Sequence, residues 1–228
     1  MKTEQRIILK GRATRLKVAK QIGEILGTRF LLAGGALTED DNPKDFDIYG
    51  VDAPIVISAV ENRVLCHEST RGYLSRTRNA ITVNIYGQTV QFCSYFKPTP
   101  QETVAAFDFA HCMAGAVFDA DGTLEYVVAM DDFWLSEKNE TTWYTGSEYP
   151  LSSLMRLMKF HKRGLFKGET HKTAAVSILC DIVERGFKDY YDFLDQCVSI
   201  SESFKDHNSV DADYLYSLLE KRKETSHD

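Results

Sequence analysis

The most constraining feature of the sequence is residues 30–51, which read FLLAGGALTEDDNPKDFDIYGV. An apolar run leads into a pair of glycines, Gly34 and Gly35, and further along Asp45 and Asp47 alternate with apolar residues. Alternation of apolar and polar residues is the period of a β-strand, so both carboxylates are expected on the same face of one strand. The fold must therefore accommodate two like charges side by side on a sheet.

This pattern predicts a particular chemistry. Two carboxylates on one strand face repel each other unless a cation lies between them. Magnesium, a hard ion that takes oxygen ligands, is the natural candidate, so Asp45 and Asp47 are predicted to be metal ligands and catalytic residues. Glycines lack a Cβ, so the backbone at Gly34 and Gly35 can approach a ligand and present N–H groups to phosphate oxygens. The alternative is structural: a chance DxD sequence and an ordinary turn.

The composition limits the class of protein. Hydrophobic residues make up 43% of the 228 residues, enough for a sizeable core, and no apolar run has the length of a membrane span. The N-terminus lacks the apolar stretch of a signal peptide, and the five cysteines are widely spaced. We therefore expect a cytoplasmic protein with reduced thiols and no membrane partner. The net charge of −6 neither supports nor excludes a nucleic-acid partner.

The order of expected elements divides the chain into two parts. Residues 1–148 are predicted to form an α/β head domain, and residues 149–228, in which the hydrophobic period becomes helical, a smaller helical domain. The elements expected in the head include helices over 13–26 and 55–62, strands over 30–33 and 64–68, and a hairpin of 81–86 with 89–96.

Three segments, taken in order, carry a resemblance to a known family. The first is the glycine pair followed by DFD. The second is the segment DFAHCMA, which begins at Asp108 and is followed by a D-G turn. The third is a helix that starts at Pro150, carries Arg156 and ends at Gly164. Over about residues 28–167 this series resembles the polymerase-β-like nucleotidyltransferase superfamily, in particular the head and neck of bacterial poly(A) polymerases and CCA-adding tRNA nucleotidyltransferases.

The resemblance implies a fold and a function. The fold would be α+β, with a mixed-sheet nucleotidyltransferase head followed by a small helical neck and body. The activity would be magnesium-dependent transfer of a nucleoside monophosphate from ATP or another NTP to an RNA (tRNA-like) 3′ end. Asp108 would contact the nucleotide sugar, with helix capping as its alternative role. Arg156 and Lys159 would reach the base and phosphates, with a solvated helix face as their alternative.

The sequence also departs from the family pattern. Gln91 stands where related enzymes often place a third carboxylate, and the chain is too short for the long body and tail of full-length CCA-adding enzymes. Two alternatives therefore stay open: a nucleotidyltransferase that modifies a small molecule or a protein, and a degenerate module that binds nucleotide or RNA without turnover. The sequence does not indicate which NTP is used or what the oligomeric state is.

Overall fold

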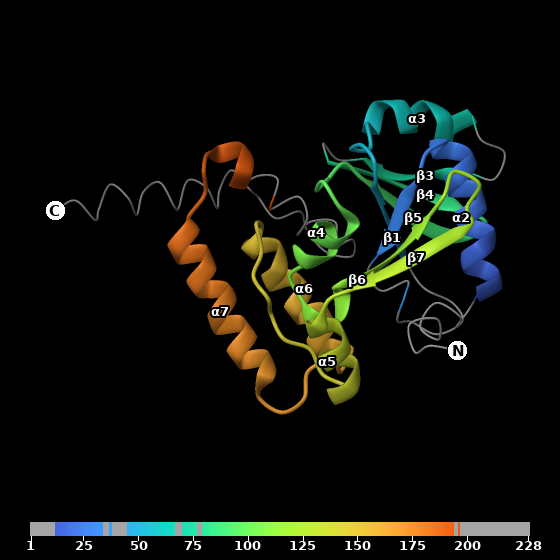
Figure 1. Ribbon diagram of the computed structural model, residues 1–228. Helices are drawn as coiled ribbons and strands as arrows, with labels where there is room; N and C mark the ends of the chain where they lie inside the picture. The colour runs from blue at the N-terminus through green and yellow to red at the C-terminus, as the bar shows by residue number, and fades with distance from the viewer. Residues whose placement is uncertain are drawn as a thin grey trace. The chain divides into compact units, whose positions relative to one another are not determined.

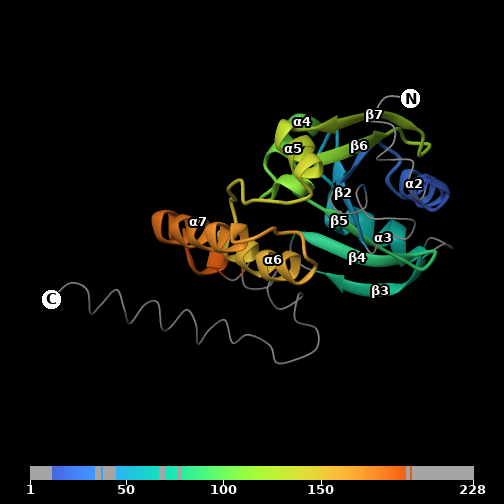
Figure 2. The same ribbon diagram turned by 90° about the horizontal axis from the view of Figure 1, so that it is seen from below.

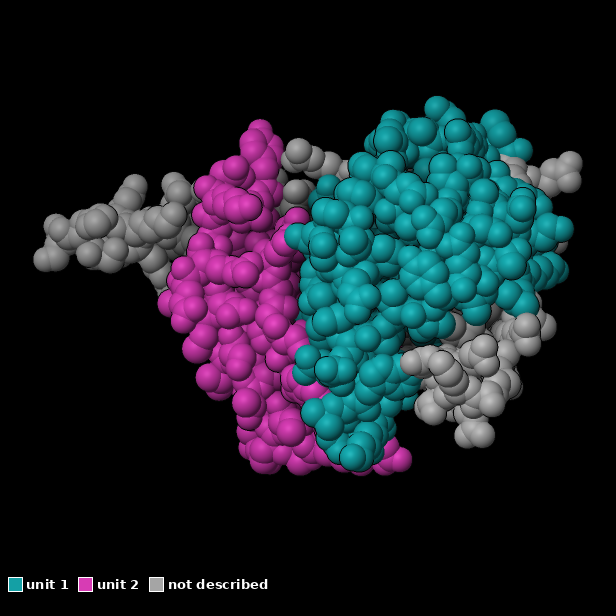
Figure 3. All heavy atoms as spheres, in the orientation of Figure 1, with its two compact units in different colours: residues 1–139 teal, residues 140–228 magenta. Residues whose placement is uncertain are grey.

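The computed structural model describes residues 12–33, 37, 45–66, 70–76, 79–193 and 196. The chain divides into two compact units, residues 1–139 and residues 140–228 (Figure 3). The first unit holds a β-sheet with its covering helices, and the second is helical. None of the described helices is both long and apolar enough to cross a membrane.

Among the described residues, seven strands form one sheet in the order β3-β4-β5-β2-β1-β6-β7 (Figure 1). The strands are β1 (Phe30–Ala33), β2 (Asp45–Gly50), β3 (Thr70–Arg76), β4 (Ala80–Ile85), β5 (Gln88–Cys93), β6 (Ala114–Phe118) and β7 (Leu124–Ala129). Strand β2 pairs in parallel with β5, and the other described pairings are antiparallel. The sheet is therefore mixed, and with its helices it gives the predicted α+β fold.

One face of the sheet is covered by α2 (Arg12–Leu26) and α3 (Ile57–Cys66), which are neighbours in Figure 2. Phe46 and Ile48 of β2 are fully buried in the main core on this face, together with Ile22 of α2. Helix α2 ends at Gly27, which has φ +65°, a conformation that glycine adopts without steric cost. Arg63 of α3 donates hydrogen bonds to the last carbonyls of α2 and so links the two helices.

The opposite face, called here the α4 face, has a smaller apolar cluster beside α4 (Pro100–Ala105). Its members include Leu31 of β1, Val104 of α4 and Val128 of β7. Gly115 of β6 lies in the same place, and a Cβ there would be 2.5 Å from Leu31 Cδ1 and 3.1 Å from Val104 Cγ1. Strands β1, β6 and β7 are thus packed on this face, while β2, β5 and β4 present polar side chains to it.

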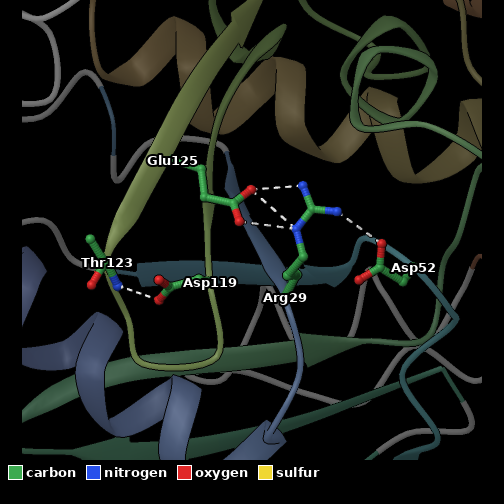
Figure 4. A network of polar contacts seen from close by, with 5 residues as sticks. All are labelled: Arg29, Asp52, Asp119, Thr123 and Glu125. Carbon is green, nitrogen blue, oxygen red and sulfur yellow. Dashed lines mark hydrogen bonds and ion pairs between the residues drawn. The ribbon is translucent and has the colours of Figure 1, made fainter.

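An ion-pair network joins three segments of the first unit (Figure 4). The guanidinium of Arg29, just before β1, lies 3.0 Å from Asp52 and 2.7 Å from Glu125 of β7. Its hydrogen bonds to Glu125 raise the pKa of Arg29 above its ordinary value. In the same view Asp119 accepts a hydrogen bond of 2.7 Å from the backbone N–H of Thr123, which closes the turn between β6 and β7.

The second unit contains α6 (Pro150–Lys162) and α7 (Thr170–Arg185). Proline opens α6, where its missing N–H costs nothing. At the other end the N–H of Leu165 donates to Phe160 O and that of Gly164 to His161 O, the bonding pattern of a Schellman motif. The predicted stop at Gly164 is therefore confirmed.

The local predictions succeed where the apolar pattern is unambiguous. Strand β1 has the predicted bounds. The strand predicted over 64–68 is wrong, because Val64 and Cys66 belong to α3, in which Val64 packs into the core. Helix α5 (Asp131–Asn139) was not predicted, and it buries Phe133. Its three apolar residues, Phe133, Trp134 and Leu135, follow one another directly and so give little signal of a helical period.

Candidate active site

The candidate site begins on β2. Asp45, Asp47 and Tyr49 are half-buried and alternate with residues that are fully buried in the main core. Because successive side chains of a strand point to opposite faces, these three lie on the α4 face. The structure thus places both carboxylates on one face, as the alternation predicts. Their role as catalytic residues stays a prediction.

The neighbours of Asp47 across the sheet are uncharged. Asp47 is paired in register with Ala33 on β1 and with Gln91 on β5. Gln91 is in turn paired with Thr82 on β4, and its Nε2 donates to Thr82 Oγ1 at 3.3 Å. Thr82 is buried, so this contact gives the Gln91 carboxamide a fixed partner on the side away from Asp47.

Aromatic rings connect β2 with the segment that carries Asp108. The ring of Tyr49 lies 5.6 Å from that of Phe107 and 6.4 Å from that of Tyr95, centroid to centroid. Asp108 follows Phe107 directly and is only 3% exposed. The next turn takes Phe109, not Asp108, as its N-cap residue. The structure therefore brings the Asp108 segment to the strand of Asp45 and Asp47, while the sugar contact stays a prediction.

The remaining predicted site residues lie elsewhere. Gly34 and Gly35 lie outside the described residues. Arg156 and Lys159 belong to the second unit, where both are exposed on α6. None of Tyr49, Tyr95 and Thr82 was predicted as a site residue. Only Tyr49 had a signal, since it continues the alternation that singled out the two aspartates.

The donor set suits magnesium. In the part of the chain that the structure describes, no group of three His, Cys, Asp or Glu side chains is placed to hold a metal ion. Asp45 and Asp47 therefore form a two-carboxylate set, half-exposed and beside a carboxamide. Magnesium is commonly held by one or two carboxylates, with water and substrate phosphates as its other ligands, and this set fits that pattern.

Comparison with known proteins identifies the family. Residues 11–139, more than half of the chain, match the family described as Gabija anti-defense 2 family protein. The chain belongs to the Gabija anti-defense 2 family. No curated protein matches the sequence significantly.

Solved structures show the fold. The CCA-adding enzyme of Thermotoga maritima, complexed with tRNA, has a TM-score of 0.51 and 9% identity, over 96% of this chain and 54% of that one. A CCA-adding enzyme complexed with ATP has a TM-score of 0.53 and 8% identity, over 92% of this chain and 53% of that one. The fold is thus similar to that of nucleotidyltransferases, and the chain spans about half the length of these enzymes.

Proposed function

We propose that the protein is a nucleotidyltransferase, which transfers a nucleoside monophosphate from ATP or another NTP to an acceptor in a magnesium-dependent reaction. The observation that carries this proposal is the position of Asp45 and Asp47, on one face of a central strand in a nucleotidyltransferase-like fold.

Each predicted residue has a role in this proposal. Asp45 and Asp47 would hold magnesium, while the backbone N–H groups at Gly34 and Gly35 would bind the β- and γ-phosphates. When bound, magnesium offsets the charge of the triphosphate and lowers the pKa of the attacking hydroxyl. Asp108 would bind the nucleotide sugar. In this proposal, residues 1–148 form the nucleotidyltransferase head, and residues 149–228 form the helical neck and body.

The second unit would supply the cations for the base and phosphates. Arg156 and Lys159 lie on the exposed surface of α6, which ends in a basic cluster. The cluster, taken along the sequence, comprises Lys159 and Lys162 of α6, Arg163 and Lys167 after it, and Lys172 of α7.

We propose an RNA 3′ end as the acceptor, supported by this basic cluster and by the tRNA in a structurally similar enzyme. Lys167 already lies 3.0 Å from Glu140, and Lys172 pairs with Glu169. At roughly 0.7 per phosphate contact, the slope of log affinity for single-stranded RNA against log salt should lie between about −2 for three contacts and −3.5 for five.

A second candidate acceptor is a protein or small molecule of a defence system. One observation favours it: the family is described as anti-defense. The activity would be the same, but labelled nucleotide would appear on the protein or small molecule instead of RNA.

The deciding experiment incubates the protein with magnesium, each α-labelled NTP in turn, and a mixture of RNA and protein acceptors. We expect label to be transferred by the wild type and not by Asp47→Asn. Asp121→Asn is the matched control, because Asp121 is an exposed aspartate in the β6–β7 turn of the same unit. No transfer with any NTP, while nucleotide still binds, would favour the non-catalytic module.

A second experiment tests the RNA acceptor. The double change Lys162→Glu, Arg163→Glu should abolish RNA binding at low salt without unfolding the protein. The double change Lys138→Glu, Lys188→Glu alters the net charge equally at exposed positions and should leave binding close to wild type. Undetectable binding of RNA by the wild type would move the proposal to the protein or small-molecule acceptor.

A further inference from the structure

Four residues of β5 and β4 lie level with the carboxylate pair. On β5 and β4, the residues level with Asp47 are Gln91 and Thr82, and those level with Asp45 are Thr89 and Asn84. All four are uncharged. The amide and hydroxyl groups of β5 and β4 can donate or accept hydrogen bonds. They carry no charge with which to neutralise a cation.

Gln91 is the neighbour of greatest interest because it is level with Asp47 on the α4 face. Its Nε2 donates to Thr82 Oγ1, and its Oε1 lies 3.8 Å from Cys93 Sγ. Thr82 and Cys93 are both buried, so the carboxamide has protein partners at both of its polar ends. Gln91 is therefore an uncharged neighbour of Asp47 in the sheet, and its carboxamide is held by Thr82 and Cys93.

The charge balance then decides how a metal would bind. Two carboxylates just neutralise one divalent magnesium ion, and they fill only part of its octahedral shell. A third carboxylate at position 91, level with Asp47, would add a negative charge beside the pair and so strengthen its attraction for a divalent ion. With glutamine there, the remaining ligands of the ion must come from elsewhere, and the triphosphate of a nucleotide supplies oxygen ligands.

We propose that Gln91 makes metal binding at this site depend on the nucleotide. The protein alone binds a divalent cation weakly, and the cation becomes firmly held only when the phosphates complete its shell. This inference rests on the proposed function, because it assumes that Asp45 and Asp47 hold the metal. By thermodynamic linkage, the metal must strengthen nucleotide binding by the same factor as the nucleotide strengthens metal binding.

The test measures Mn²⁺ binding to the full chain in the absence of nucleotide, from the free-ion signal in electron paramagnetic resonance. Gln91→Glu should bind Mn²⁺ at least about tenfold more tightly than wild type. Gln88→Glu is the matched control: it adds the same charge to the same strand, but three positions away and so on the opposite face. Gln91→Asp provides a second variant should the glutamate not fold.

A companion measurement gives the affinity for a non-hydrolysable ATP analogue with and without magnesium. The wild type should show a gain of at least about tenfold with magnesium, and Gln91→Glu a smaller gain, because its metal site no longer needs the phosphates. Tight Mn²⁺ binding by the wild type alone, an unchanged affinity in both position-91 variants, or an equal gain in Gln88→Glu would each overturn the proposal.

The two proposals fail in different ways. If Mn²⁺ binding follows these expectations but no NTP gives transfer, the proposed activity is wrong and the account of Gln91 stands. If transfer occurs and is lost in Asp47→Asn, while the position-91 variants bind Mn²⁺ no more tightly than wild type, only the account of Gln91 is wrong.

Discussion

Two acidic pairs in the first unit differ in what surrounds them. Asp52 and Glu125 come from separate segments and share one cation of the chain, Arg29 (Figure 4). Asp45 and Asp47 are alternate residues of one strand, and the residues paired with Asp47 on either side, Ala33 and Gln91, carry no charge. The first pair ties segments together, whereas the second concentrates negative charge on one face. The first pair is joined to the fold through Arg29, and the second is the pair proposed above to bind the metal.

The largest expected effect comes from the second pair. Asp45→Asn and Asp47→Asn should each lower magnesium-dependent transfer by at least about a hundredfold, the size of effect seen when one electrostatic partner of a transition state is removed. Asp52→Asn should leave transfer near wild type. The measurement is the rate of label transfer, with thermal unfolding as the control. Near-wild-type turnover in either Asp45→Asn or Asp47→Asn would mean that this pair is not the catalytic centre.

The next effect concerns stability. Gly115→Ala should destabilise the protein by about 1–3 kcal/mol, because its Cβ would press on Leu31 and Val104 in a packed apolar cluster. A loss of this size, compared with the small loss expected when the Arg29 ion pairs are removed, would mean that apolar packing contributes more to the stability of the sheet than these ion pairs do. Urea unfolding measures it, and a free energy of unfolding equal to wild type would count against the close packing described.

A smaller effect is expected for a cation proposed to act with the second pair. Arg156→Ala should weaken nucleotide binding by about tenfold, the range of one hydrogen bond to a charged group. Arg156 is exposed on α6, so thermal stability should change little. Isothermal titration and thermal unfolding together decide the role. A large stability loss with unchanged affinity would make Arg156 a structural residue.

The smallest effect is expected at the first pair. Arg29→Met leaves Asp52 and Glu125 without their shared cation, so it should lower the melting temperature slightly, less so at high salt because exposed charges are screened. Nucleotide transfer should not change. Melting curves at two salt concentrations test this expectation. A loss of transfer without a loss of stability would assign Arg29 to the site.

The fold could be predicted largely because periodicity is a local signal. The alternation around Asp45 and Asp47 predicted a strand with both carboxylates on the same face, and β1 was predicted with its bounds. Val64 shows the limit of such reasoning: its short apolar run suits a strand or a buried helix equally, and contact with the core decides in favour of the helix.

The neighbours of the site could not be predicted in the same way. The pairing of Gln91 with Asp47 depends on a parallel register between strands far apart in the sequence, which local pattern does not encode. The contact of Tyr49 with Phe107 and Tyr95 depends on the same tertiary arrangement. The sequence therefore indicates which residues are chemically suited to a site, and the structure adds what lies beside them.

The central claim is that Asp45 and Asp47 hold the metal of a nucleotidyltransferase site. The most direct test is Mn²⁺ binding in the presence of a non-hydrolysable NTP analogue, compared between the wild type and the double variant Asp45→Asn, Asp47→Asn. The account predicts that the wild type forms a ternary complex with metal and nucleotide. The double variant should still fold but should not bind Mn²⁺. Equal Mn²⁺ binding by the two proteins would contradict the claim.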